Sequence, residues 1–192
     1  MLNASLMAKS GIILPFFILA LAVFPSLPVA RVLIEKSMAF HILFQIPMLI
    51  LAGYALKNKP KGVQYSLAQS LTQWLWVYLS GLFWMLPISL DKALIYPVWD
   101  IFKIISLLIT GAVLKVVFQS HRILALFFIG STTMMLFFVG FYYQETDIRL
   151  CNAYLIESQQ VTGSGLIVAA SLLLLFLLWK IQQGLNIVES NK

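Results

Sequence analysis

Charge is scarce in this sequence. Only 10% of its 192 residues are Asp, Glu, Lys or Arg, whereas a soluble domain of this size carries about 25%. Hydrophobic residues make up 61% of the chain. Because so little polar surface is available, we expect lipid to surround most of the protein. The same shortage excludes a separate soluble domain, so residues 1–192 are expected to form a single transmembrane domain.

Cysteine, histidine and catalytic motifs are also nearly missing. Cys151 is the single cysteine, which excludes an intrachain disulfide and a Cys-x-x-Cys metal clamp. There is no phosphate-binding loop, no Gly-x-Ser-x-Gly and no His-Glu-x-x-His, so the sequence leaves open whether the protein is an enzyme. The net charge of +6 does not indicate nucleic acid binding, because Lys and Arg fall at the ends of apolar runs, where topology signals belong.

What the sequence has in abundance is long apolar runs. Interrupted by charge, glycine and proline, they predict an all-α fold: a polytopic bundle of about six transmembrane helices. The expected spans are residues 11–30, 38–56, 69–88, 96–118, 123–143 and 164–183. The connections, including 89–95 and 144–163, are too short to fold alone.

The positive charges predict the orientation. One side of the expected bundle receives Lys9, Lys57, Lys59, Lys61, Lys115, Arg122, Lys180 and Lys192. The other receives fewer: Arg31, Lys36, Lys92 and Arg149, with Lys103 inside the fourth span. Lys and Arg favour the cytoplasmic side, so we expect both termini in the cytoplasm of a bacterial inner (plasma) membrane. Nearly all acidic residues then lie outside.

Polar residues inside the second span are the first candidates for a site. An ionisable side chain in lipid raises the free energy of membrane insertion, so its presence points to a function or to a partner. His41 and Gln45 are four residues apart and share one helical face, and Pro47 follows them. His41 is a candidate metal or haem ligand or proton carrier. The alternative is a histidine that only bonds a neighbouring helix or lies at the interface.

The third and fourth spans add four more candidates on the same outer side. Trp84 and Asp91 close the third span and are either site residues or an interfacial anchor and a helix cap. Asp100 and Lys103 are three residues apart near the start of the fourth span, so they can pair on one face. A structural ion pair and a functional charge pair both remain open for them.

A dense polar stretch precedes the last span. It contains Arg149, Asn152 and Gln160. Its helical spacing allows a short outer helix lying on the bundle. Equally, these three side chains could cap a cavity that opens outward.

Three sequence motifs are similar to those of a known family. They are His41-x-x-x-Gln45-x-Pro47, then Trp84-x-x-Pro87 followed by Ala93-Leu94, and finally Glu157-Ser158-Gln159-Gln160-x-x-Gly163. In this order, over residues 38–170, the chain resembles the CtaG-type cytochrome c oxidase assembly proteins, polytopic membrane proteins linked to copper delivery. The resemblance implies a respiratory oxidase as partner and copper as the metal. Gln45 stands where the family usually has a second histidine, and the histidines expected after Trp84 and around the fourth span are missing. Only His41 therefore carries the implied metal site.

Three functions follow from these observations. The first is an assembly or accessory protein of a respiratory or copper-dependent membrane complex. It would act through an outer polar site of His41, Gln45, Trp84, Asp91, Asp100, Lys103, Arg149, Asn152 and Gln160. The second is a small transporter or channel component, suggested by the Asp100–Lys103 pair within a span. The third is a haem- or metal-binding membrane enzyme subunit that uses His41.

Overall fold

The computed structural model describes residues 16–26, 37–56, 65–118, 121–150 and 154–190. All secondary structure in these ranges is helical, which confirms the all-α prediction. An apolar helix, Phe16–Ser26, ends in the 3-10 turn η1 (Phe24–Ser26). The others are the π-helix η2 (Phe40–Gln45), α3 (Ile46–Leu56), α4 (Leu67–Met85), α5 (Pro87–Ile95), α6 (Pro97–Val117), α7 (Arg122–Glu145) and α8 (Ile156–Ser190).

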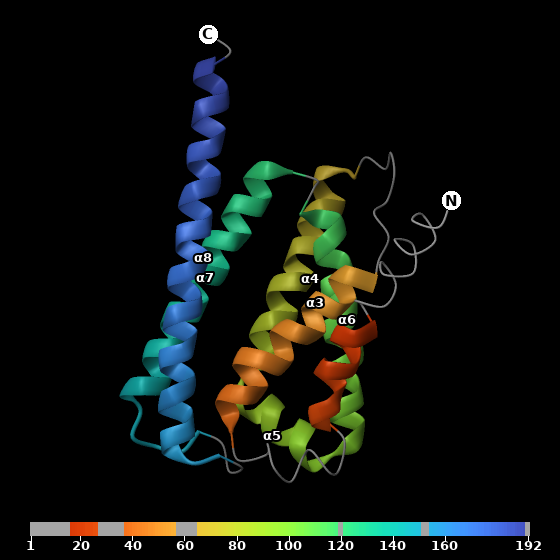
Figure 1. Cartoon of the computed structure of the whole chain (residues 1–192), viewed down its shortest axis with the longest axis vertical. Coiled ribbons are helices and arrows are strands. Elements are labelled where there is room, and N and C mark those ends of the chain that lie inside the picture. The colour runs from red at the N-terminus through yellow and green to blue at the C-terminus, as the bar shows by residue number, and fades with distance from the viewer. Residues whose placement is uncertain (1–15, 27–36, 57–64, 119–120, 151–153, 191–192) are drawn as a thin grey trace, which may run out of the picture.

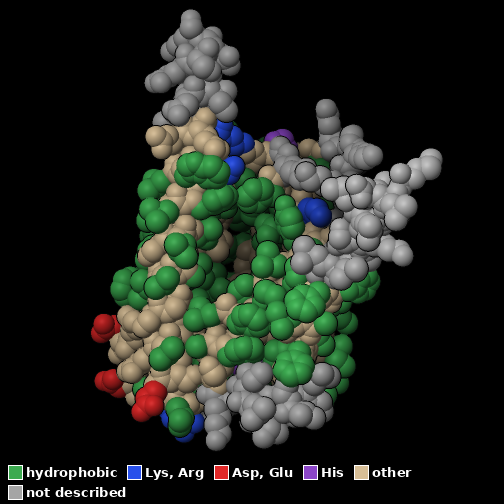
Figure 2. All heavy atoms as spheres, viewed as in Figure 1, with side chains coloured by type: hydrophobic (Ala, Val, Ile, Leu, Met, Phe, Trp, Pro, Cys, Tyr) green, Lys and Arg blue, Asp and Glu red, His purple; other side chains and the backbone are tan. Residues whose placement is uncertain are grey.

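The long helices run alternately up and down between two ends of a bundle (Figure 1). The short helix α5 lies at one end, together with the start of η2 and the segment after α7; we call this the α5 end. Figure 2 shows acidic side chains gathered toward this end, with a basic group beside them, and basic side chains mainly at the opposite end, which we call the basic end. At the basic end an Arg122 Nη atom donates to the Lys180 carbonyl at 3.0 Å, which fixes α7 and α8 as antiparallel neighbours.

The described surface is strongly apolar. On α7, Ile123 is 82% exposed, Phe138 74% and Met134 72%. Soluble monomers rarely expose contiguous apolar surface of this extent. Two described helices, Arg122–Glu145 and Ile156–Gln183, are long and apolar enough to cross a membrane. Both observations fit a lipid environment.

The end of α4 and the start of α8 differ from the expected spans. α4 ends at Met85 because Pro87 lacks an N–H and clashes with the preceding turn. Proline suits the first turn of a helix, so Pro87 begins α5, and residues 89–95, expected as a connection, are helical.

The last helix begins at Ile156 and not near 164. The reason is that Gly163 does not break it but packs against α7. A Cβ on Gly163 would lie 2.6 Å from the Gly140 carbonyl oxygen. The glycine thus permits a close helix crossing, and no described residue forms the short separate outer helix that is one of the alternatives for this stretch.

A similar close crossing of two helices joins α3 to α6. A Cβ on Gly53 of α3 would overlap the Leu108 carbonyl of α6, and one on Gly111 of α6 would overlap the Ile50 carbonyl of α3. The two backbones are therefore in direct contact. This contact places η2, which precedes α3, alongside the first half of α6.

Candidate functional site

One face of α6 carries polar residues that are all buried. Asp100, Lys103, Ser106 and Thr110 follow one another at helical spacing and are 8%, 3%, 5% and 1% exposed. Lys103 Nζ lies 2.7 Å from Asp100 Oδ1, so these two residues form the ion pair that their spacing allows. Asp100 is the fourth residue of α6, which places the pair near the α5 end.

Gln45 joins this ion pair to His41. Its Oε1 accepts from Lys103 Nζ at 3.1 Å and from His41 Nδ1 at 2.8 Å. Its Nε2 donates to Ser26 Oγ at 3.1 Å and to the Ala22 carbonyl at 3.4 Å. An amide side chain offers two donors and two acceptor positions, so Gln45, which is fully buried, is completely satisfied. We call Asp100, Lys103, Gln45 and His41 the polar network.

The geometry of the amide fixes the hydrogen position on His41. Because Gln45 Oε1 has no proton, the Nδ1 of His41 must carry the hydrogen of their bond. The imidazole is 4% exposed. It packs against the rings of Tyr154 and Phe40, with centroids 6.1 and 6.2 Å away.

Local backbone structure explains how His41 and Gln45 come to face α6. Both lie in the π-helix η2, where the Ile46 N–H bonds to the His41 carbonyl five residues back. Pro47 has no N–H and its ring crowds the preceding turn, which favours this wider turn. Single π-turns inside α-helices are frequent at functional sites.

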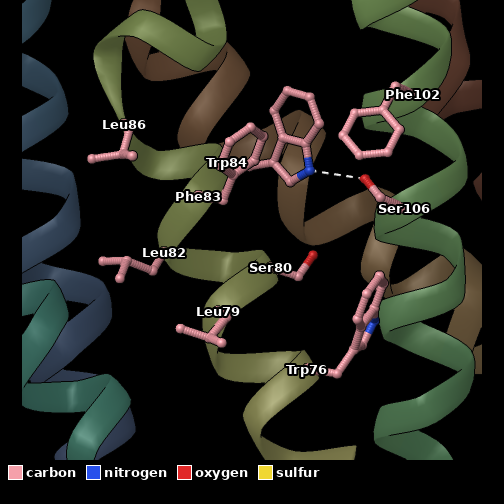
Figure 3. Close-up of a pocket in the computed structure, with 9 residues that line it drawn as sticks. All are labelled: Trp76, Leu79, Ser80, Leu82, Phe83, Trp84, Leu86, Phe102 and Ser106. Carbon is pink, nitrogen blue, oxygen red and sulfur yellow. Dashed lines mark hydrogen bonds between the residues drawn. The ribbon is translucent and has the colours of Figure 1, made fainter.

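Trp84 lies next to the polar network, on the far side of Ser106. Its indole N–H donates to Ser106 Oγ at 2.8 Å, and Ser106 Oγ in turn donates to the Lys103 carbonyl at 3.1 Å. Trp84 is 1% exposed. Figure 3 shows this bond at the edge of a groove between α4 and α6 whose volume is about 480 Å³.

The other predicted site residues lie on α5, on α8 and in the segment between α7 and α8. Asp91 is half-buried on α5. Arg149 is exposed, and its Nε donates to the Tyr154 carbonyl at 3.1 Å. Gln160 is exposed on α8, while Asn152 lies outside the described residues.

The sequence suggests Gln160 as a site residue, but its neighbour Gln159 is the buried one of the two. Its Oε1 accepts from the Leu150 N–H at 3.1 Å, and its Nε2 donates to the carbonyls of Tyr143 and Thr146 at 3.4 and 3.3 Å. It is 2% exposed. Gln159 therefore fastens the segment after α7 to the start of α8.

A second cavity, of about 250 Å³, extends from the middle of the bundle toward the basic end. Residues of α3, α4, α6, α7 and α8 line it, and none of them is charged. Its two threonines, Thr110 and Thr132, each bond to a carbonyl of their own helix. The charged part of the interior is thus confined to the α5 end among the described residues.

The polar network does not suit a copper ion. His41 Nδ1 donates to the Gln45 oxygen, so only Nε2 of this imidazole could ligate a metal, and the Asp100 carboxylate is paired with Lys103. Among the described residues, no group of three or more His, Cys, Asp or Glu side chains could hold a metal. The described residues therefore supply too few ligands for the metal site that the resemblance implies.

No family model, curated protein or solved structure matches the chain. The resemblance to the CtaG-type proteins accordingly stays a prediction, and the function must be inferred from the geometry.

Proposed function

We propose that this protein is an accessory or assembly protein of another complex in a bacterial inner membrane, to which it presents its α5 end. The observation that carries the proposal is the polar network, which is buried, has its Asp100 and Lys103 charges paired with each other and is located at that end. The bilayer surrounds the bundle, and both termini lie in the cytoplasm.

The length of α6 supports a further span beside the two helices that are most apolar. At 1.5 Å per residue, the 21 residues of α6 extend about 32 Å, enough for a hydrocarbon core of about 30 Å. The charges of Asp100 and Lys103 make α6 less apolar in composition, but they neutralise each other at 2.7 Å. A paired charge is far less costly in lipid than an isolated one.

Aromatic and basic side chains support the orientation. Lys180 Nζ lies 4.8 Å from the centre of the Trp179 ring, and Lys115 Nζ lies 5.2 Å from that of Tyr54. Such neighbours are typical of a membrane–water interface, and an excess of Lys and Arg marks the cytoplasmic side. The α5 end is then the outer end.

The closed state of the polar network favours an accessory role. A transporter needs its buried charges open to a path, and an enzyme needs its polar groups open to substrate. In this protein the charges are paired, and Gln45 has all its hydrogen-bonding positions filled. These bonds hold the first helix, η2 and α6 in one arrangement, and buried polar groups of this kind favour a unique structure. The bonds thereby shape the outer end for recognition.

A respiratory oxidase is the partner that the resemblance implies, and deletion of the gene tests it. We expect the deletion strain to lose activity of a membrane oxidase, and the plasmid-borne wild type to restore it. A tagged protein should co-purify with oxidase subunits after mild crosslinking. Unchanged oxidase activity together with purification of the tagged protein alone would contradict the proposal.

A second candidate, a small transporter, is favoured by one observation, the ion pair inside a span. The double variant Asp100→Asn with Lys103→Met removes both charges while leaving none unpaired. Purified protein in proteoliposomes decides the matter: proton or cation flux that this variant abolishes would establish transport. Equal and negligible flux from both proteins supports the accessory role.

A further inference from the structure

Two cationic side chains lie together where α7 and α8 meet at the basic end. Arg122 is the first residue of α7, and its guanidinium is held against α8 by the 3.0 Å bond to the Lys180 carbonyl. The Lys180 ammonium lies over two rings of its own helix, 4.8 Å from the centre of Trp179 and 5.7 Å from that of Phe176. Both cations are thus positioned by contacts other than ion pairs. We call Arg122 and Lys180 the cationic pair.

Within the described part of the chain, neither member of the cationic pair forms a salt bridge. The acidic residue nearest to Lys180 along α8 is Glu189, nine positions on, and the one nearest to Arg122 along α7 is Glu145, at the opposite end of that helix. At 1.5 Å per residue, these positions are about 14 and 35 Å away. The Arg122 guanidinium also uses only one of its five N–H groups in its bond to α8. The pair therefore offers two positive charges and several donors to an external anion.

Outward-facing apolar side chains lie next to the cationic pair on both helices. On α7 these are Ile123 and Phe127, which are 82% and 65% exposed, and on α8 they are Leu175 and Trp179, which are 63% and 51% exposed. Figure 2 shows hydrophobic side chains directly below the basic ones at this end. A tryptophan beside a lysine is typical of the level at which lipid headgroups lie. An anion that binds here from the membrane thus meets charge at its head and hydrocarbon along its body.

We infer that the cationic pair binds the phosphate of an anionic phospholipid, whose acyl chains lie along the exposed apolar side chains of α7 and α8. A guanidinium matches phosphate oxygens with two parallel N–H bonds, and the lysine ammonium adds a second charge. A soluble phosphate would use the cations but not the apolar surface, and a zwitterionic lipid would bring a cation of its own. In the proposed orientation the pair faces the cytoplasmic leaflet, where anionic lipids make the surface potential negative. The inference rests on the proposed membrane insertion but not on the accessory role.

Native mass spectrometry of the detergent-purified protein measures the affinity for the first bound lipid. The probes are phosphatidylglycerol, phosphatidylcholine with the same acyl chains, and glycerophosphoglycerol, which is the soluble headgroup of the first lipid. Phosphatidylglycerol is expected to bind about tenfold or more tightly than phosphatidylcholine. One Lys or Arg near a membrane surface contributes a factor of about five. Arg122→Gln and Lys180→Gln should therefore each weaken phosphatidylglycerol binding about fivefold, and the double variant should bind both lipids about equally.

A matched control separates the site from the net charge of the protein. Lys115→Gln removes one positive charge from the same end, but from α6, where the ammonium lies over the Tyr54 ring at 5.2 Å. It should change phosphatidylglycerol binding less than about twofold, because salt screens a charge that does not contact the lipid. The inference fails if Lys115→Gln and Lys180→Gln weaken binding equally.

Fluorine NMR of protein labelled with 5-fluorotryptophan locates the bound lipid. The Trp179 signal, assigned through Trp179→Phe, should shift in a saturable manner with phosphatidylglycerol, whereas that of Trp99, near the start of α6 at the other end, should stay in place. The inference also fails if Trp179 does not respond, if phosphatidylcholine binds as tightly, or if glycerophosphoglycerol displaces the lipid at equal concentration, since the site would then accept any phosphate. Such a failure is distinct from failure of the accessory role, which the deletion strain and co-purification test separately.

Discussion

Replacing Lys103 by methionine keeps the length of the side chain and removes the ammonium group that joins Asp100 to Gln45. The Asp100 carboxylate, 2.7 Å from Lys103 Nζ in the native protein, is then buried without its cation. Gln45 Oε1 also loses one of its two donors. The variant therefore tests whether the polar network stabilises the α5 end in the way its geometry indicates.

The expected magnitude follows from the burial of the pair. Removing one partner of a buried ion pair costs about 3–5 kcal/mol, whereas removing both is often close to neutral. We expect Lys103→Met and Asp100→Asn each to lower the free energy of unfolding by about 3 kcal/mol or more. The double variant should lose only about 1 kcal/mol, which gives a coupling energy of several kcal/mol between the two sites.

Reversible unfolding in mixed micelles of mild detergent and dodecyl sulfate, followed by circular dichroism, measures these differences. Lys92→Met is the matched control, because Lys92 is exposed on α5 and its ammonium lies over the Trp99 ring at 4.9 Å. It should cost no more than about 1 kcal/mol. Single-variant losses below about 1 kcal/mol, or losses that simply add in the double variant, would refute the assignment of a buried, coupled pair.

Two further comparisons use neighbouring or similar residues as controls. Gly111→Ala should destabilise the protein by several kcal/mol because its Cβ overlaps the Ile50 carbonyl, whereas Gly81→Ala, with nothing within 4 Å, should be neutral or stabilise by up to about 1 kcal/mol. Thermal unfolding in detergent distinguishes them, and equal effects would mean that the α3–α6 contact is looser than described. Gln159→Leu should cost about 2 kcal/mol or more because three backbone groups lose their partner, while Gln160→Leu should lie within about 0.5 kcal/mol of wild type. If the two glutamine variants unfold at the same temperature, the buried role of Gln159 is wrong.

The existence of the helices is predictable from the sequence because apolar runs are long and charge is rare. Pro87 predicts the end of a helix, and α4 does end just before it, at Met85. Pro87 is also the first residue of α5, which the sequence does not predict. Gly163 suggests a turn before the last span, whereas its missing side chain permits packing against Gly140. In the sequence, a glycine that ends a helix looks the same as a glycine that lets two helices pack closely. Only the position of the neighbouring helix distinguishes the two cases.

The site is partly predictable for a related reason. An ionisable or amide side chain in lipid needs a partner, so His41, Gln45, Asp100 and Lys103 can be selected one by one. That they form one network depends on the π-helix and on the close contact of α3 with α6, which involve residues far apart in the sequence. Which of Gln159 and Gln160 is buried depends on the helix face that each occupies. The sequence predicts that the last helix starts at residue 164, so it places neither glutamine on that helix, whereas α8 starts at Ile156.

The central claim is a bundle with its α5 end outside and its basic end in the cytoplasm, and cysteine labelling tests it most directly. The native chain has one cysteine, Cys151, and in a Cys151→Ser background single cysteines can replace Ile148, 73% exposed at the α5 end, and Gln182, exposed at the basic end. A membrane-impermeant maleimide added to intact spheroplasts should modify Ile148→Cys, and should reach Gln182→Cys only after permeabilisation. Modification of Gln182→Cys in intact spheroplasts, with Ile148→Cys protected, would contradict the account.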